Sequence, residues 1–282
     1  MAKCPKIALV TGHEFGIAAL LGLICSKEYE EKKFSVDLIV APSADKTKDI
    51  VGYSNPLTIA SQIGASTLIA TDSKLEKHRT LIADHQIDCL LVIGWSYLIA
   101  KNVRQCVRRT IDGIPATIGM HPSPLPVGRA PIPWTILKQL KKTALTVFLL
   151  DDKADSGPIV ARYPFTVPPN STSSDLFRIF QALHYSAGEG LAQCIANWKF
   201  ATHKQDEALA TRWLKRLPED SCILPGMTIA EAMLLVRAAR SPYPQAYIET
   251  PIGKRVIHVL ERAPTARTKG RIQLNDGELW YY

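Results

Sequence analysis

Short apolar runs alternate with amphipathic stretches along the first two-thirds of the chain. Apolar runs at 6–12, 36–42, 66–71 and 88–95 are typical of strands that are buried on both faces. The stretches at 15–33 and 72–86 between them carry apolar residues at helical spacing. Further strands are predicted at 116–122, 144–151 and 158–167. The pattern therefore predicts an α/β fold, Rossmann-like, with a mostly parallel sheet and helices on both of its faces.

The pattern changes after a long amphipathic helix predicted at 173–198. A polar, irregular stretch follows, and then one helix, a proline-rich turn and strands that continue to the end of the chain. We expect three parts on this basis. They are an N-terminal catalytic domain over 1–200, a linker over 201–227 and a small β-rich domain over 228–282.

Composition narrows the class of protein. The 282 residues include no run near the roughly 18 apolar residues of a membrane span. Gly12, His13 and Glu14 interrupt the first apolar run where a signal peptide would continue, so we expect a cytoplasmic protein. The six cysteines show neither a CxxC nor a metal-ligand spacing, which indicates reduced thiols and no metal site. The net charge of +8 suits an anionic ligand, but its spread along the chain argues against nucleic-acid binding.

Polar side chains follow three of the predicted strands. The segments Trp95–Ile99, His121–Arg129 and Asp151–Asp155 each come directly after an apolar run. Ligands of open parallel sheets bind outside the carboxyl ends of the strands, so we expect these three segments to converge there. A histidine and a carboxylate on neighbouring strands can together move a proton, which makes His121 and Asp155 a candidate pair.

Each candidate also has an ordinary structural interpretation. Asp155 alone would more often be a turn-forming residue, and Trp95 and Trp134 would more often pack in a core. His13 is expected to be a surface-loop histidine more often than part of a site. The remaining histidines have helical or strand contexts without partner spacing and are expected to be structural: His78, His85, His184, His203 and His258.

Several motifs together resemble the folate-dependent formyltransferases. They are His-Pro-Ser-Pro-Leu-Pro at 121–126, Asp-Ser-Gly at 155–157, GWSYLI at 94–99, GRAPIPW at 128–134 and RAARSPYPQAY at 237–247. The resemblance covers nearly the whole chain. Within the family, the Arg-Ala-Pro-x-x-Trp run is more similar to sugar-nucleotide N-formyltransferases than to methionyl-tRNA formyltransferases. The resemblance also implies that the small C-terminal domain is OB-like.

This resemblance implies transfer of a formyl group from N10-formyltetrahydrofolate to the primary amine of an amino-deoxy sugar on a nucleoside diphosphate. It implies a homodimer that uses no metal and binds neither nucleic acid nor membrane. His121 would be the general acid/base and Asp155 its supporting carboxylate. The folate pocket would be lined by Tyr97, Leu98, Ile99, Arg129, Asp151, Asp152, Lys153, Ala154 and Asp155. The sugar nucleotide would contact Trp95, Ser123, Pro124 and Trp134.

Two departures from the family pattern concern the same site. Gly119 occupies the catalytic position where the family usually has an asparagine that donates to the oxyanion. The loop Val127–Pro131 lacks two residues of the usual motif. A smaller departure lies outside this site, where Gln245 replaces a glycine in the C-terminal element. Three alternatives therefore stay open. They are a methionyl-tRNA formyltransferase, a hydrolase that releases formate from the same folate, and a protein that binds folate or a nucleotide sugar without turnover.

Overall fold

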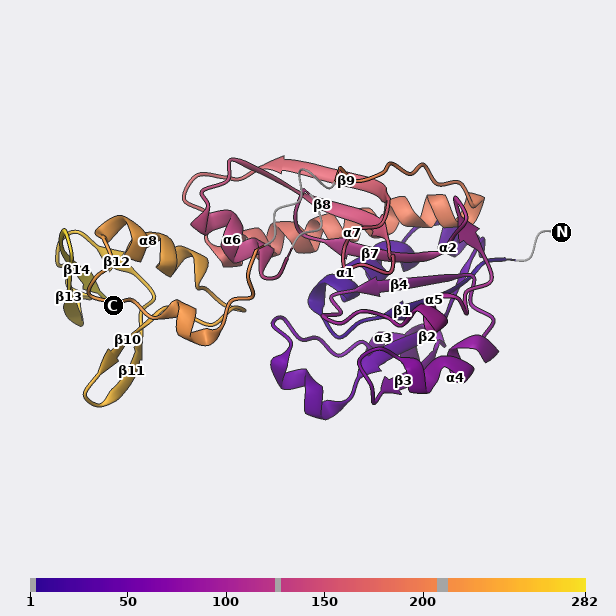
Figure 1. Cartoon of the computed structure of the whole chain (residues 1–282), viewed down its shortest axis with the longest axis horizontal. Coiled ribbons are helices and arrows are strands. Elements are labelled where there is room, and N and C mark those ends of the chain that lie inside the picture. The colour runs from indigo at the N-terminus through magenta and orange to yellow at the C-terminus, as the bar shows by residue number, and fades with distance from the viewer. Residues whose placement is uncertain (1–3, 125–127, 207–212) are drawn as a thin grey trace. The chain divides into compact units, whose positions relative to one another are not determined.

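The structure is a computed structural model that describes residues 4–124, 128–206 and 213–282 (Figure 1). The chain folds into two compact units. The first contains 1–126, 144–164 and 179–210, and the second contains 127–143, 165–178 and 211–282. Residues 127–143 and 165–178, which were expected inside the N-terminal domain, thus group with the C-terminal residues. None of the described helices is long and apolar enough to cross a bilayer.

A seven-stranded sheet forms the centre of the fold, in the order β3-β2-β1-β4-β7-β8-β9. Neighbouring strands from β3 to β7 run parallel, whereas β8 runs antiparallel to β7. This confirms the predicted Rossmann-like, mostly parallel sheet. The strands are β1 (Lys6–Val10), β2 (Ser35–Pro42), β3 (Ser66–Ala70), β4 (Cys89–Ile93), β7 (Thr117–His121), β8 (Lys142–Leu149) and β9 (Ile159–Thr166), and a short hairpin is formed by β5 (Thr110–Ile111) and β6 (Ile114–Pro115).

Helices connect these strands (Figure 1). Two helices, α1 and α7, approach each other closely. A Cβ at Gly22 of α1 would collide with the carbonyl of Tyr185 in α7, and one at Gly188 would collide with the carbonyl of Ala19. Glycine at both positions lets the two backbones approach. The helices are α1 (Glu14–Ile24), α2 (Lys27–Glu30), α3 (Leu57–Ile63), α4 (Arg79–Asp84), α5 (Lys101–Arg104), α6 (Pro131–Leu137) and α7 (Ser173–Asn197), with 3-10 turns η1 (Ala44–Asp49) and η2 (Glu76–His78).

The order of the strands reverses between β1 and β4, which creates a topological switch point at their carboxyl ends. The loops after β1, β4 and β7 all leave the sheet at this edge. The segment Asp151–Asp155 does not. His121 stands opposite Thr146, but Leu149 at the end of β8 stands opposite Ile118, so the chain leaves β8 toward the amino end of β7. Our expectation that all three segments follow parallel strands was wrong for this one, because an apolar run does not record strand direction.

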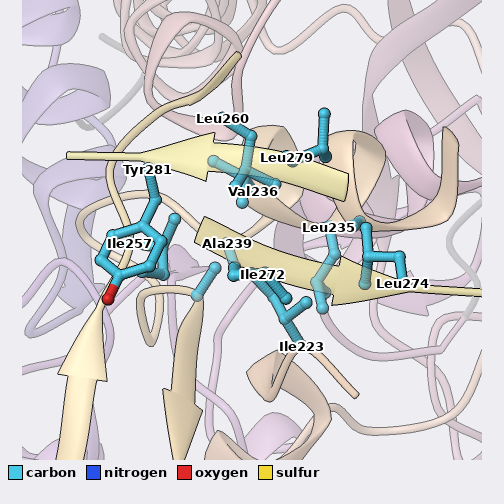
Figure 2. Close-up of a cluster of buried hydrophobic side chains, with 12 residues drawn as sticks. Ile223, Leu235, Val236, Ala239, Ile257, Leu260, Ile272, Leu274, Leu279 and Tyr281 are labelled. Atoms are coloured by element: carbon cyan, nitrogen blue, oxygen red, sulfur yellow. The ribbon is translucent and has the colours of Figure 1, made fainter. Parts of the chain in front are cut away.

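The C-terminal part of the second unit is strand-rich, as predicted. It contains η4 (Pro218–Ser221), α8 (Ile229–Ala238), the hairpin β10 (Tyr247–Thr250) and β11 (Gly253–Val256), and an antiparallel sheet of β12 (Leu260–Glu261), β14 (Gly277–Tyr281) and β13 (Gly270–Leu274). Figure 2 shows the core that holds these elements together. Leu235 and Val236 of α8 face apolar side chains of the sheet, among them Ile272 and Leu279.

Candidate active site

His121 is the last residue of β7, and the loop that follows fixes its ring. The Nδ1 atom of His121 lies 2.9 Å from the Oγ atom of Ser123, whose side chain is fully buried. The hydroxyl of Thr146 on β8 donates to the carbonyl of Ser123 at 2.6 Å and to that of Pro124 at 3.1 Å. Ser123 and Pro124 thus help to hold His121 in place, and their predicted contact with the sugar nucleotide stays a prediction. The rest of the motif, Leu125 and Pro126, lies outside the described residues.

A buried arginine joins the two segments that were predicted to bind folate. The guanidinium of Arg104 in α5 donates to the carbonyl of Ile99 at 3.3 Å and to that of Leu150 at 3.4 Å, and it forms an ion pair with Asp152. Arg104 is only 5% exposed. Arg104 was not predicted as a site residue, because one arginine in a four-residue helix makes no recognisable pattern in the sequence.

The exposed side of these segments suits a flat apolar ligand. Tyr97 is 47% exposed and Leu98 51% exposed, although both are large apolar side chains. Trp95 beside them is fixed, because its indole N–H donates to the carbonyl of Ser73 at 2.9 Å and its ring meets Tyr97 edge-on. Covering such side chains with a ring system removes apolar surface from water, which favours binding.

The loop 151–157 is held by residues on either side of it. Lys101 lies 3.0 Å from the carboxylate of Asp152, and hydrogen bonds from Lys101 and Arg104 lower the pKa of that carboxyl group. The side-chain amide of Gln205 donates to the carbonyls of Asp155 and Gly157 at 2.9 and 2.7 Å. Asp151, Lys153 and Ala154 are exposed, and Asp155 is half-buried. These contacts do not test the pairing of Asp155 with His121, which stays a prediction.

Gly119 lies two residues before His121 on β7, opposite Phe148 of β8. A Cβ atom at this position would lie 3.1 Å from the Phe148 ring and 3.4 Å from Leu150. Apolar side chains thus fill the space that an asparagine would occupy.

We expect the Gly119→Asn substitution to destabilise the protein rather than improve the site. The added side chain must push Phe148 aside, and such overpacking costs about 1–3 kcal/mol of unfolding free energy. Denaturant unfolding of Gly119→Asn and of the control Gly226→Asn measures this cost. Gly226 has open space around its Cβ position, so its variant should unfold like the parent. If both variants were equally stable, a side chain at position 119 would not be crowded by Phe148.

Two further residues predicted for the site belong to the second unit. Trp134 in α6 donates its indole N–H to the carbonyl of Leu214 at 2.9 Å, and the guanidinium of Arg216 lies 5.7 Å from its ring centre. Arg129 is exposed, and its backbone N–H donates to the carbonyl of Trp213. The segment 128–134 is thereby tied to 213–216. Val127, at the start of the shortened loop, lies outside the described residues.

A protein-family model described as formyl transferase matches residues 9–192, which is more than half of the chain. The chain belongs to the formyl transferase family. It is 30% identical over 134 residues to the methionyl-tRNA formyltransferase of Flavobacterium psychrophilum, and 40% identical over 120 residues to that of Mycoplasma pneumoniae. These matches cover 46% and 42% of this chain but 42% and 35% of the relatives. The chain thus spans less than half the length of the curated relatives that it matches.

Solved structures that resemble this family member share its fold over nearly its whole length. WlaRD, a sugar 3N-formyl transferase solved in the presence of dTDP and 5-N-formyl-THF, superimposes with a TM-score of 0.68, covering 99% of this chain and 98% of that one at 16% identity. The N-formyltransferase of Helicobacter canadensis, in complex with folinic acid and dTDP-3-aminofucose, gives 0.68 over 99% and 100% at 17% identity. HypX of Aquifex aeolicus, in complex with tetrahydrofolic acid, gives 0.66 over 99% of this chain and 44% of its own at 14% identity.

Two histidines that were expected to be structural or in a surface loop, His13 and His184, gather near His121. His13 follows β1 and caps α1, with its Nδ1 accepting from the Phe15 N–H at 3.0 Å. The Phe15 ring stacks on His184 of α7, which is 1% exposed and whose Nδ1 lies 2.6 Å from the carbonyl of Phe180. His13 is therefore a helix cap rather than a surface-loop residue. Its position directly after the first strand was the only signal in the sequence.

Both rings are uncharged at neutral pH. Burial lowers the pKa of His13 to about 4. Burial also lowers the pKa of His184 to about 3; the hydrogen bond to the Phe180 carbonyl raises it, and the protonated forms of His13 and His121 lower it. Because a carbonyl only accepts, the Nδ1 of neutral His184 carries the proton. Its Nε2 has no hydrogen-bond partner among the described residues.

These pKa values predict that the protein loses stability in weak acid. The ordinary histidine pKa of about 6.5 applies to the unfolded chain, so between pH 6.5 and 3 the unfolded state binds more protons at His184. The unfolding free energy should fall as the pH falls through this window, by up to about 1.4 kcal/mol per pH unit from this group. Urea unfolding at pH 7.5, 6 and 5 measures the slope. His184→Leu should reduce the slope to the part that His13 contributes, and His258→Asn, at an exposed position, should leave it unchanged. An unchanged slope in His184→Leu would refute the assignment.

Proposed function

We propose that this protein transfers the formyl group of N10-formyltetrahydrofolate to the primary amine of an amino-deoxy sugar carried on a nucleoside diphosphate. The observation that supports this proposal most strongly is the position of His121. It lies at the carboxyl end of β7, at the edge of the sheet that contains the topological switch point, next to the loop after β4 with its exposed Tyr97 and Leu98. Two proteins with this fold were solved with a folate and with dTDP or a dTDP-sugar, which supports the same ligand classes for this chain. These two proteins align with the chain over 98–100% of their own length.

Each residue has a role in this proposal. The neutral amine attacks the formyl carbon, a new C–N bond forms, and the formyl oxygen becomes an oxyanion. His121 accepts the proton that the amine nitrogen loses and delivers it to N10 of the folate as the C–N10 bond breaks. Asp155 is the proposed carboxylate that stabilises the imidazolium of His121 by its charge. No oxidation takes place, and no group of three or more His, Cys, Asp or Glu side chains that could hold a metal occurs in the described part of the chain.

The residues present fit the folate. Tyr97 and Leu98 offer apolar surface, and the backbone groups of 97–99 and 151–155 offer the donors and acceptors that a pterin edge requires. Arg104 fixes both segments through Ile99 and Leu150. We assign Arg129 to the folate and Trp95 and Trp134 to the sugar nucleotide by their family motifs. A homodimer and a cytoplasmic location stay predictions.

A second candidate is formyl transfer to methionyl-tRNA, because the curated sequence relatives are methionyl-tRNA formyltransferases. One assay separates the two. Purified protein is incubated with N10-formyltetrahydrofolate and with a panel of amino-deoxy nucleotide sugars or Met-tRNA, and the products are weighed by mass spectrometry. One added formyl on a nucleotide sugar supports the proposal, and one on Met-tRNA selects the second candidate. Release of formate without an acceptor would indicate a hydrolase, and folate binding without turnover would indicate a binding protein.

A further inference from the structure

The hydroxyl of Ser123 is built into the structure as a partner of the His121 ring. Its Oγ lies 2.9 Å from Nδ1, and the whole residue is inaccessible to solvent. The Ser123 N–H donates to the carbonyl of His121 at 2.9 Å. Thr146, which stands opposite His121 across the β7–β8 pair, donates to the Ser123 carbonyl at 2.6 Å and is also fully buried. The backbone of the serine is thus held by two hydrogen bonds, and its side-chain oxygen lies next to Nδ1 of His121.

We propose that Ser123 is a positioning residue that accepts the Nδ1–H of His121 and thereby leaves the Nε2 lone pair of His121 for the proton of the amine. The proposal rests on the acid/base role given to His121 above. A neutral imidazole carries one proton, and the partner of one ring nitrogen decides where that proton lies. A hydroxyl that accepts from Nδ1 keeps the ring in one orientation and in the tautomer that a general base requires.

The topology favours this serine over Asp155 as the direct partner of the ring. The loop that contains Asp155 leaves β8 after Leu149, which stands opposite Ile118, three positions before His121 on β7. The described hydrogen bonds that tie this loop to other segments come from Lys101 and Arg104 in α5 and from Gln205. Ser123, two residues from His121, needs no movement of a second strand to reach Nδ1. The carboxylate would then act through charge, and the serine through a hydrogen bond.

The titratable groups around the His121 ring determine what a change in its titration reports. His13 and His184 interact electrostatically in the same cluster as His121, but their lowered pKa values leave both uncharged above pH 5. Thr146 on the facing strand does not titrate. In the 151–155 loop, hydrogen bonds from Lys101 and Arg104 lower the pKa of Asp152, so this carboxylate keeps its charge above pH 5. A change in the titration of His121 between pH 5.5 and 9 therefore reports on its own ring and partner.

The decisive measurement is the nitrogen chemical shifts of His121 in 15N-histidine-labelled protein at high pH, assigned with His121→Asn. We expect the proton on Nδ1 in the parent and in Ser123→Thr, and a shift toward the Nε2–H tautomer in Ser123→Ala. In the transfer assay, Ser123→Ala should lower kcat about 10-fold or more, with the KM of both substrates within twofold and partial rescue in Ser123→Thr. Thermal melts confirm that the variants are folded.

The outcomes separate this proposal from the proposed function. A parent ring protonated on Nε2 at high pH, or a tautomer that does not respond to Ser123→Ala, overturns the positioning role. If Ser123→Ala does not fold, the spectrum of the parent alone decides. The tautomer can be read without any acceptor, so a serine-dependent tautomer in a protein that transfers no formyl group would uphold the positioning role and refute the proposed function.

Discussion

Replacing His121 with asparagine should abolish formyl transfer while folate still binds. General acid/base groups contribute about 10²–10⁴-fold to the rate, so kcat should fall by a factor in this range. Asparagine keeps a polar side chain of similar size, and the folate contacts proposed at 97–99 and 151–155 do not involve the imidazole. The dissociation constant of the folate should therefore change less than about threefold, which is within about 0.7 kcal/mol.

A matched control is available in the same chain. His258 is an exposed histidine in the second unit, and His258→Asn should leave both turnover and folate affinity unchanged. The rate of formyl transfer, followed by absorbance, gives kcat. Titration of the tryptophan fluorescence with folate gives the dissociation constant of the folate. Full transfer activity in His121→Asn would mean that another group accepts the amine proton. If both folate binding and turnover were lost, His121 would contribute to folate binding rather than to proton transfer.

The strands of the sheet could be predicted from the sequence because the pattern that identifies a strand is local. Apolar runs of strand length separated by helical spacing appear in any window of the chain, and β1, β2, β3, β4 and β7 lie where they were expected. Strand direction is not a local property. β8 runs antiparallel to β7, whereas the apolar run at 144–151 is compatible with either strand direction.

The candidate site shows the same division between local and long-range information. His121 was found because it sits in a proline-broken loop after a strand. The support given by Thr146 and the filling of the Gly119 site by Phe148 come from a different strand, and only the register of β7 with β8 pairs them. Arg104 was missed for a related reason, since its partners lie 5, 46 and 48 residues away.

Arg104→Met should weaken both the fold and the proposed folate pocket. Methionine keeps most of the length and apolar contact of the side chain but removes all donors. The carbonyls of Ile99 and Leu150 then lose the guanidinium hydrogen bonds, and leaving buried polar groups unsatisfied costs about 1–3 kcal/mol each. We expect the unfolding free energy to fall by about 2–4 kcal/mol. Because the segments 97–99 and 151–155 lose their common anchor, folate affinity should fall at least tenfold.

Two control variants separate the pocket from general destabilisation. Arg108 also pairs with a carboxylate, Asp88, at 2.7 Å, but at the amino end of β4. Arg108→Met should therefore cost stability without changing folate affinity. Lys101→Met removes only an exposed pair with Asp152, and such pairs contribute about 0–1 kcal/mol. Urea unfolding and folate titration of the three variants are the measurements. If Arg104→Met and Arg108→Met lower folate affinity equally, the effect belongs to stability, and Arg104 does not organise the pocket.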